Sequence, residues 1–291
     1  MAKALESVAR SEVPESIEWE VLVIDNNSRD ATRSVVEEFC RRAPSRFRYL
    51  FEPQRGKSYA LNSGCQAANS DVLAFMDDDV EVDPHWLYSV TAPLMCGEWA
   101  GVGGRILPER GFVPQRWMDV SSRYGLAPLA MFDLGGEPGE LKESPFGTNM
   151  AFRKEMFSKH GEFRIDLGPQ PGSEIRSEDT EFGSRLLAAG ERLWYEPSAI
   201  VYHAVPQNRA GRKYFQTWWF GKGRADVREI GISTEAKWYI AGIPLYLFRR
   251  LAMGTLRFTI SIREPERFSS KLKIYWLAGN VRECYKKAHS T

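Results

Sequence analysis

The chain has 291 residues, enough for one large domain or for one domain with an appendage. Its 39 basic and 38 acidic residues leave a net charge of +1, so no general electrostatic attraction to nucleic acid is expected. The four cysteines lie far apart and form no CxxC pair. A zinc site or a disulfide framework is therefore not expected, and a reducing, cytoplasmic compartment fits best.

Strands and helices alternate over the first hundred residues. The apolar and polar patterns predict helices over 2–10, 31–42 and 59–68, and buried strands over 20–24, 47–51 and 72–76. This alternation is typical of an open α/β sheet.

The rest of the chain has two characters. Residues 97–143 are rich in Gly, Pro and aromatics, with a short strand expected over 101–107, and then a helix over 177–190 and a strand over 200–203. Beyond about residue 206 the composition shifts to Trp, Tyr and Arg. We therefore divide the chain into a domain over 1–205 and a helical, aromatic and basic extension over 206–291.

No membrane-spanning helix is expected. The first residues lack the apolar core of a signal peptide. Arg249, Arg250 and Arg257 interrupt the most apolar stretch, 238–262, before it reaches the roughly 18 uncharged residues that a span needs.

Three consecutive aspartates, Asp77, Asp78 and Asp79, follow the strand expected over 72–76. In open α/β sheets, ligands bind beyond the carboxyl ends of the strands. Adjacent carboxylates repel unless a cation intervenes, and alternate residues point the same way, so Asp77 and Asp79 could share one divalent ion. Oxygen ligands favour magnesium or manganese. The alternative is a solvated acidic turn.

Three further groups each allow two interpretations. Glu178 and Asp179 begin the helix over 177–190, where they either complement the helix dipole or supply a general base. Lys57 stands at a helix start and either meets a phosphate or belongs to a solvated basic turn. His203 ends a strand and is either structural or a metal ligand, the latter only if the aspartates lie nearby.

Six motifs resemble, in order and spacing, family 2 glycosyltransferases of the GT-A fold, over roughly residues 1 to 205. They are Val-Leu-Val-Ile-Asp25-Asn-Asn-Ser, Arg-Gly-Lys57-Ser-Tyr-Ala-Leu-Asn62, Phe-Met-Asp77-Asp-Asp79, Phe146-Gly-Thr-Asn149-Met-Ala-Phe-Arg153, Ser-Glu178-Asp179-Thr-Glu-Phe, and Tyr-His203. The resemblance implies a Rossmann-like, mostly parallel open sheet flanked by helices. It also implies inverting, metal-dependent transfer of a sugar from a nucleoside-diphosphate sugar to an acceptor hydroxyl of a glycan or lipid-linked acceptor.

The resemblance also implies residue roles. Asp179 would be the catalytic base with Glu178 beside it, and Asp79 and His203 would hold Mg²⁺ or Mn²⁺. The residues that would bind the sugar donor are Asp25, Asn27, Lys57, Asp77, Asp78 and Asn149.

The chain departs from this family at its beginning. Members start with an apolar strand that lies centrally in the sheet, beside the strand expected here over 20–24. Without that strand, hydrogen-bonding groups of the sheet would be left unpaired in a buried place. We therefore expect that Met1 is not the start of the functional protein, or that something else fills the gap.

Aromatic and basic residues interleave in two stretches of the extension, 214–224 and 243–250. Such a pattern is typical of an interfacial helix, and we expect peripheral contact with the inner face of the cell membrane. The alternative is an appendage that packs these aromatics on the catalytic domain.

Two other functions remain open from the sequence. One is a non-catalytic relative that binds a nucleotide sugar or carbohydrate. The other is a sugar nucleotidyltransferase, although the Gly-rich basic loop expected near the N-terminus of such an enzyme is absent.

Overall fold

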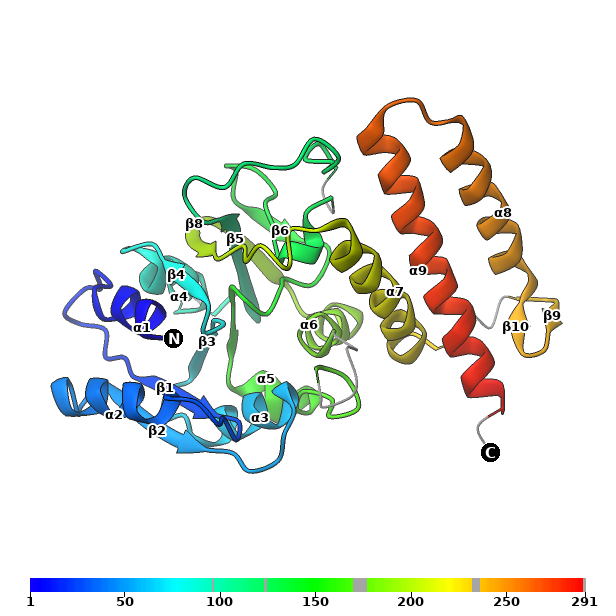
Figure 1. Cartoon of the computed structure of the whole chain (residues 1–291). Coiled ribbons are helices and arrows are strands. Elements are labelled where there is room, and N and C mark those ends of the chain that lie inside the picture. The colour runs from blue at the N-terminus through cyan, green and yellow to red at the C-terminus, as the bar shows by residue number, and fades with distance from the viewer. Residues whose placement is uncertain (96, 123–124, 170–176, 232–235, 290–291) are drawn as a thin grey trace. The chain divides into compact units, whose positions relative to one another are not determined.

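A computed structural model describes residues 1–95, 97–122, 125–169, 177–231 and 236–289 (Figure 1). The chain divides into two compact units. The first, called the sheet unit, comprises Met1–Arg110, Ala130–Pro171 and Glu178–Ala204. The second, called the helical unit, comprises Gly111–Leu129, Gly172–Ser177 and Val205–Thr291. The division at residue 205/206 stays our proposal for the domain organisation.

The first half of the sheet unit contains a two-stranded parallel sheet with three helices. Strand β1 (Val21–Asp25) pairs with β2 (Phe47–Phe51), with Val21 opposite Phe47 and Asp25 opposite Phe51. The helices are α1 (Ala2–Ala9), α2 (Thr32–Arg42) and α3 (Lys57–Ala67). Val23, Val36 and Phe39 are buried together in a small core. These elements lie within one or two residues of the predicted ones.

A larger, mixed sheet follows, with the strand order β3-β7-β5-β8-β4 and β6 added on β8. Strands β5 and β8 pair in parallel, and the remaining neighbours are antiparallel. The elements are β3 (Val72–Phe75), β4 (Val80–Val82), α4 (Trp86–Met95), β5 (Gly101–Pro108), β6 (Gly139–Leu141), β7 (Met150–Arg153), α5 (Glu155–His160), α6 (Glu178–Ala188) and β8 (Leu193–His203). The predicted α/β class is confirmed.

Strand β8 is longer than the strand predicted over 200–203. Pro197 interrupts the apolar pattern, and Pro cannot donate a ladder hydrogen bond, which argues against a strand on sequence alone. The register shows how the sheet accommodates it. Gly104 faces Glu196, but the next residue, Arg105, faces Ile200. The extra residues form an irregularity that carries the strand on to His203.

Aromatic packing fixes the position of α6. Phe182 of this helix is fully buried and stacks on Phe157 with ring centroids 4.4 Å apart. Phe152 of β7 meets Phe182 edge to face at 5.0 Å. Such pairs contribute about 0.5–1.5 kcal/mol each beyond burial. They anchor the helix whose first turn carries Glu178 and Asp179.

Strands β1 and β3 face each other across a gap. Among the described residues β1 pairs only with β2, and β3 pairs only with β7. A cavity of about 660 Å³ lies between them, lined by both strands along their whole length and by the apolar residues Leu5, Val8 and Leu61. Figure 1 shows β1 and β2 set apart from the larger sheet. Two strand edges with unpaired backbone groups therefore border one mostly apolar space.

We propose that an apolar strand completes the sheet in this gap, as the resemblance implied. The amine of Met1 lies 2.5 Å from the carbonyl oxygen of Asp78, beyond the carboxyl end of β3. A chain extended before Met1 by about six Val and Ile residues would reach the gap directly. The extension should raise the free energy of unfolding by about 4–5 kcal/mol, taking mid-range values of about 2.25 kcal/mol for each buried side chain and about 1.5 kcal/mol for ordering each residue's backbone. Urea unfolding measures it, with a Gly/Ser extension of equal length as control. Equal stability of the two extended chains would contradict the proposal.

The helical unit contains three long helices and a short hairpin. Helix α9 (Glu264–His289) packs against both α7 (Arg212–Glu229) and α8 (Leu245–Ile260). The hairpin of β9 (Tyr239–Ile240) and β10 (Ile243–Pro244) precedes α8, and a short 3-10 helix, η1 (Ala127–Leu129), contacts α7. The predicted helical character of the extension agrees with these elements. No helix in the described part of the chain is both long and apolar enough to span a bilayer.

A buried ion-pair network joins α7 to α9. The side chain of Glu283 is 3% exposed, and its carboxylate accepts hydrogen bonds from Nε of Arg224 at 2.9 Å and from Nε of Arg228 at 2.6 Å. Burial raises the pKa of Glu283, but the two guanidinium groups outweigh it, and the pKa lies below the ordinary value of 4.5. Its stabilising effect is therefore present above that value and is lost as the pH falls through the lower pKa of the folded state.

Replacing Glu283 should destabilise the helical unit strongly. Glu283→Gln leaves two partly buried arginines short of their counter-charge, and we expect a loss of about 3 kcal/mol in the free energy of unfolding at neutral pH. The difference from the unsubstituted chain should begin to shrink below pH 4.5 and should be lost once the pH has fallen through the lower pKa of the folded state, where the native carboxylate is protonated too. Denaturant unfolding across this pH range measures both effects. Glu266→Gln, which removes an exposed pair with Arg263, serves as the control and should change little.

Candidate active site

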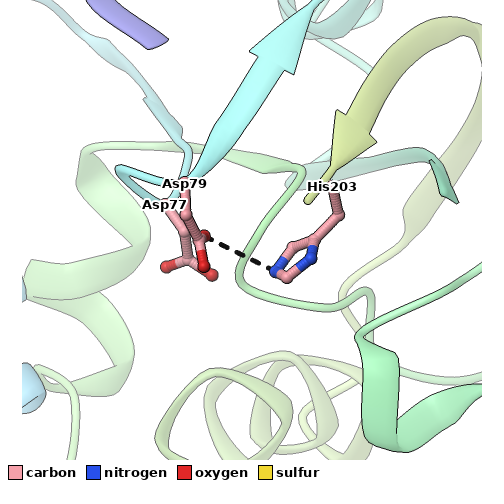
Figure 2. A group of neighbouring side chains, drawn as sticks. All are labelled: Asp77, Asp79 and His203. Atoms are coloured by element: carbon pink, nitrogen blue, oxygen red, sulfur yellow. Dashed lines mark ion pairs between the residues drawn. The ribbon is translucent and has the colours of Figure 1, made fainter. Parts of the chain in front are cut away.

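The strand ends of the larger sheet bring Asp77, Asp79 and His203 together. The aspartates lie between β3 and β4, and the pairing of Val80 with His203 sets the histidine beside them. One ligand atom from each of the three lies within 4.8 Å of the others (Figure 2). Nε2 of His203 is 3.5 Å from Oδ1 of Asp79. The exposed Asp78, between the two aspartates, is not part of this group.

The orientation of His203 suits a metal ligand. Its ring is buried, and Nδ1 lies 2.7 Å from the carbonyl oxygen of Ala204. Because a carbonyl only accepts, Nδ1 must carry the proton, and in the neutral ring the lone pair is then on Nε2, toward the carboxylates. A ligating histidine is commonly held in this way by a hydrogen bond from its other nitrogen. Two carboxylates and one oriented imidazole fit a divalent cation.

Lys57 links the aspartates to the start of α6. Its Nζ donates to Oδ1 of Asp77 at 2.7 Å and lies 3.7 Å from Oε1 of Glu178. Oδ2 of Asp77 accepts a hydrogen bond from the hydroxyl of Thr148 at 2.7 Å. Burial raises the pKa of Asp77, but the charge of Lys57 outweighs it and lowers that pKa to about 2. Burial acts to lower the pKa of Lys57, yet the surrounding carboxylates, Asp77 first, raise it above its ordinary value.

Glu178 and Asp179 have different surroundings. Glu178 is 3% exposed, and burial together with the charge of Asp179 raises its pKa to about 7, against the opposing effect of Lys57. Asp179 is half-buried, and it accepts hydrogen bonds from the backbone amides of Gly147 at 2.6 Å (Oδ2) and Thr180 at 2.8 Å (Oδ1). Each of its oxygens keeps a further lone pair. Asp179 is therefore oriented by the backbone and still able to accept a proton.

The end of β1 forms a second polar corner. Asp25 is buried and accepts hydrogen bonds from the amide of Ser28 at 2.9 Å and from the hydroxyl of Tyr49 at 2.7 Å. Burial raises the pKa of Asp25, but these hydrogen bonds outweigh it, and the pKa lies below its ordinary value. Asn26 donates to the carbonyl of Gln54 at 2.6 Å and accepts from the amide of Gly56 at 2.7 Å. Asn26 thereby ties the loop before Lys57 to β1.

The cavity between β1 and β3 ends on these groups. Its polar lining includes four of the residues predicted to bind the sugar donor, Asp25, Lys57, Asp77 and Asp78, and also Gly147. Asn27 is not part of that lining; its side chain donates to the carbonyl of Pro53 at 3.2 Å.

The structure gives Asn149 another role than the predicted contact with the sugar donor. Its side chain is fully buried; Oδ1 accepts from the indole of Trp86 at 2.8 Å, and Nδ2 donates to the carbonyls of Arg105 and Ala199, each at 2.8 Å. All of its hydrogens are used inside the fold. Asn149 holds the strand ends together, and its neighbour Thr148 is the residue of this motif that reaches Asp77.

This difference can be measured. Asn149→Ala would leave the Trp86 indole and two carbonyls without partners, and we expect a loss of about 3 kcal/mol in the free energy of unfolding. Thr148→Val removes one hydrogen bond to a charged carboxylate, so we expect a smaller loss of about 1.5 kcal/mol and weaker nucleotide-sugar binding, since its hydroxyl orients Asp77. Urea unfolding and ligand titration of both variants separate the two roles. An Asn149 variant of native stability that binds the ligand poorly would restore the original prediction.

Four residues at the site were not singled out from the sequence: Thr148, Gly147, Tyr49 and Asn26. Thr148 and Gly147 lie inside the motif Phe146–Arg153, but the resemblance points to Asn149 as the residue of this motif that binds the sugar donor. At Gly147 an added Cβ would lie 2.5 Å from Oδ2 of Asp179, so only glycine allows this approach. Tyr49 sits on a strand where an aromatic is expected anyway, and nothing local distinguished it.

Comparison with known proteins agrees with this geometry. A family model described as Glycosyl transferase family 2 matches residues 1–161, more than half of the chain. The succinoglycan biosynthesis protein ExoM of Rhizobium meliloti (strain 1021) is 28% identical over 229 residues, which cover 78% of this chain and 70% of ExoM. Glycosyltransferase AglE of Haloferax volcanii is 27% identical over 230 residues, covering 77% and 68% of the two chains.

Solved structures share the fold. The mannosyltransferase PcManGT from Pyrobaculum calidifontis, solved with GDP-Man and Mn²⁺, superposes with a TM-score of 0.65 at 18% identity, covering 97% of this chain and 82% of that one. GalNAc-T7, solved with UDP, GalNAc and Mn²⁺, gives a TM-score of 0.53 at 15% identity over 82% of this chain and 50% of that one. The chain thus belongs to glycosyl transferase family 2 and is a glycosyltransferase of the GT-A fold.

Proposed function

We propose that the chain transfers a sugar from a nucleoside-diphosphate sugar to an acceptor hydroxyl, with a divalent cation and with inversion at the anomeric carbon. The observation that supports this best is the convergence of Asp77, Asp79 and His203 beside Lys57 and the α6 start. A family 2 glycosyltransferase needs a place for the diphosphate and a base for the acceptor, and this group of residues can supply both.

The cation would be held by Asp79 and His203, with Asp77 shared between it and Lys57. When bound, Mg²⁺ or Mn²⁺ would act as a Lewis acid that neutralises charge on the departing diphosphate. Lys57 would contact a phosphate oxygen, and its place in the lining at the cavity's polar end supports this role. The nucleoside side of the sugar donor would occupy that end, near Asp25, with Asn27 and Asp78 at the margin.

Asp179 would remove the proton from the acceptor hydroxyl. It is oriented by two backbone amides and keeps a lone pair on each oxygen. The buried Glu178 is the poorer candidate, because its raised pKa leaves it partly protonated near neutral pH and Lys57 stands beside it. We assign Glu178 the role of positioning Lys57. A single displacement by the activated hydroxyl inverts the anomeric configuration.

The acceptor would be a sugar hydroxyl of a growing glycan or of a lipid-linked saccharide. ExoM is named for succinoglycan biosynthesis, which supports a saccharide acceptor for a chain 28% identical to it. The cytoplasmic location and the contact with the inner face of the cell membrane stay predictions. The nucleotidyltransferase alternative loses its support, because the matching relatives are named as glycosyltransferases or for polysaccharide biosynthesis.

The proposal is tested by presenting a panel of GDP- and UDP-sugars, with manganese and with EDTA, in a thermal-shift assay followed by product analysis. We expect one nucleotide sugar to raise the melting temperature only with the cation. Proton NMR of the transferred sugar should then show the anomeric configuration opposite to that of the sugar donor. A product with retained configuration would refute the single displacement, and full activity in EDTA would refute the metal dependence.

A further inference from the structure

One surface of the helical unit exposes an unusual number of large apolar side chains. On the β9–β10 hairpin and just before it, Trp238 is 74% exposed and Ile240 57%. On α8, only one stripe packs inward, with Leu247 and Gly254 buried and Leu251 partly buried. Eight further apolar residues of this segment are exposed, whereas Ile243 is buried and Phe258 partly buried: Tyr239, Leu245, Tyr246, Phe248, Met253, Leu256, Ile260 and Ile262. We call residues 236–263 the exposed apolar surface.

The same segment carries charge of one sign only. Between residues 236 and 263 there are five basic residues and no acidic one; the five are Lys237, Arg249, Arg250, Arg257 and Arg263. All five are exposed. With 3.6 residues per turn, Arg249 lies on the same outward face as Leu245, Leu256 and Ile260. Arg250 and Arg257 both lie about 80–100° from Arg249 around the helix, on one side of that face. The chain as a whole is nearly neutral, so this concentration of positive charge is local.

A hollow lies where the hairpin meets α8. It has a volume of about 390 Å³ and is lined by the side chains of Lys237, Trp238, Leu245, Tyr246, Phe248 and Arg249. Two basic side chains, those of Lys237 and Arg249, therefore border a cavity whose other lining residues are aromatic or aliphatic. Such a combination suits a phosphate headgroup with an acyl chain attached, and aromatic side chains with an apolar body and a polar tip prefer this depth of a bilayer.

We infer that the exposed apolar surface docks on an anionic phospholipid membrane, with α8 lying in the plane of the interface. Exposed apolar area on a helix that also carries only positive charge is the pattern of an interfacial anchor, and each arginine or lysine near an anionic leaflet strengthens binding. A second protein copy would have to bring the same positive charge against it, which opposes self-association through this face. The inference goes beyond the proposed transfer reaction and does not depend on it.

The stretch 214–224, also predicted to contact the membrane, exposes fewer side chains than residues 236–263. Trp218 and Trp219 lie on α7 and are only partly exposed, and their rings pack against each other with centroids 5.2 Å apart. Exposed apolar side chains are found beyond the predicted stretch 243–250, from Trp238 to Ile262.

The test is flotation of the full chain with vesicles of phosphatidylcholine alone and of phosphatidylcholine mixed with phosphatidylglycerol. We expect binding to the mixed vesicles that weakens with added salt, and little binding to the neutral ones. Arg249→Gln with Arg257→Gln should weaken binding about 30-fold, since two basic residues near an anionic surface are removed. Leu256→Gln with Ile260→Gln should weaken it at least about 10-fold through lost apolar burial.

The controls match these changes at exposed sites outside the surface. Lys142→Gln with Lys159→Gln removes two positive charges from the sheet unit, and Ile230→Gln removes an exposed isoleucine from the end of α7. Both should bind vesicles like the unsubstituted chain. Circular dichroism melting confirms that every variant is folded. Equal binding to neutral and anionic vesicles, no binding to either, or dimerisation through Leu256 and Ile260 in sedimentation would each overturn the inference.

Discussion

Asp179→Asn is expected to lower the turnover number of sugar transfer by about 10²–10⁴-fold, the usual contribution of a positioned general base. The substitution keeps the size of the side chain but removes its capacity to take a proton. Binding of the nucleotide sugar should change little, because Asp179 contacts the backbone of Gly147 and Thr180 rather than the groups proposed to hold the diphosphate. Initial rates and ligand titration on the same preparation separate the two quantities.

A matched control addresses the structural alternative for Asp179. Glu155 also stands in the first turn of a helix, α5, and is exposed. If acidic residues in first turns only complement the helix dipole, Glu155→Gln and Asp179→Asn should both reduce stability slightly and leave turnover alone. We expect instead that Glu155→Gln transfers sugar normally. Full turnover by Asp179→Asn would remove Asp179 from the mechanism.

Much of the site could be predicted because short-range rules place its residues. Asp77 and Asp79 follow an apolar strand, and the alternation of an extended segment predicts that they point the same way. They do converge in the structure, but Asp78 and Asp79 form a turn there rather than an extended segment. His203 lies beside these two aspartates because β4 pairs with β8, which sets Val80 opposite His203. That long-range antiparallel contact left no local signal, and only the order of the motifs suggested it.

The surroundings of Asn149 could not be read from the sequence. The resemblance predicts that Asn149 contacts the sugar donor, and this contact stays a prediction. The neighbours of its side chain in space, Trp86, Arg105 and Ala199, come from three other elements, and only their positions show that every hydrogen-bonding group of the amide is occupied. Burial of a polar side chain with full pairing is a property of the tertiary structure, which composition and spacing cannot reveal.

Asp79→Asn should reduce affinity for Mn²⁺ and sugar transfer together, each by at least about 100-fold, since a carboxylate ligand is lost and metal stabilisation of a leaving diphosphate amounts to several kcal/mol. Isothermal titration with Mn²⁺ in the presence of nucleoside diphosphate measures the first quantity, and initial rates over a range of Mn²⁺ concentrations measure the second.

Asp78→Asn is the control. It makes the same change of charge one residue away, outside the group formed with His203, and should keep its Mn²⁺ affinity within about threefold. His203→Gln should resemble Asp79→Asn, because it removes the nitrogen that the Ala204 carbonyl orients toward the carboxylates. Unchanged Mn²⁺ affinity in both variants would contradict the proposed metal site. His203 and Asp79 would then be only an ion pair beside the carboxylate of Asp77, and the metal would bind elsewhere.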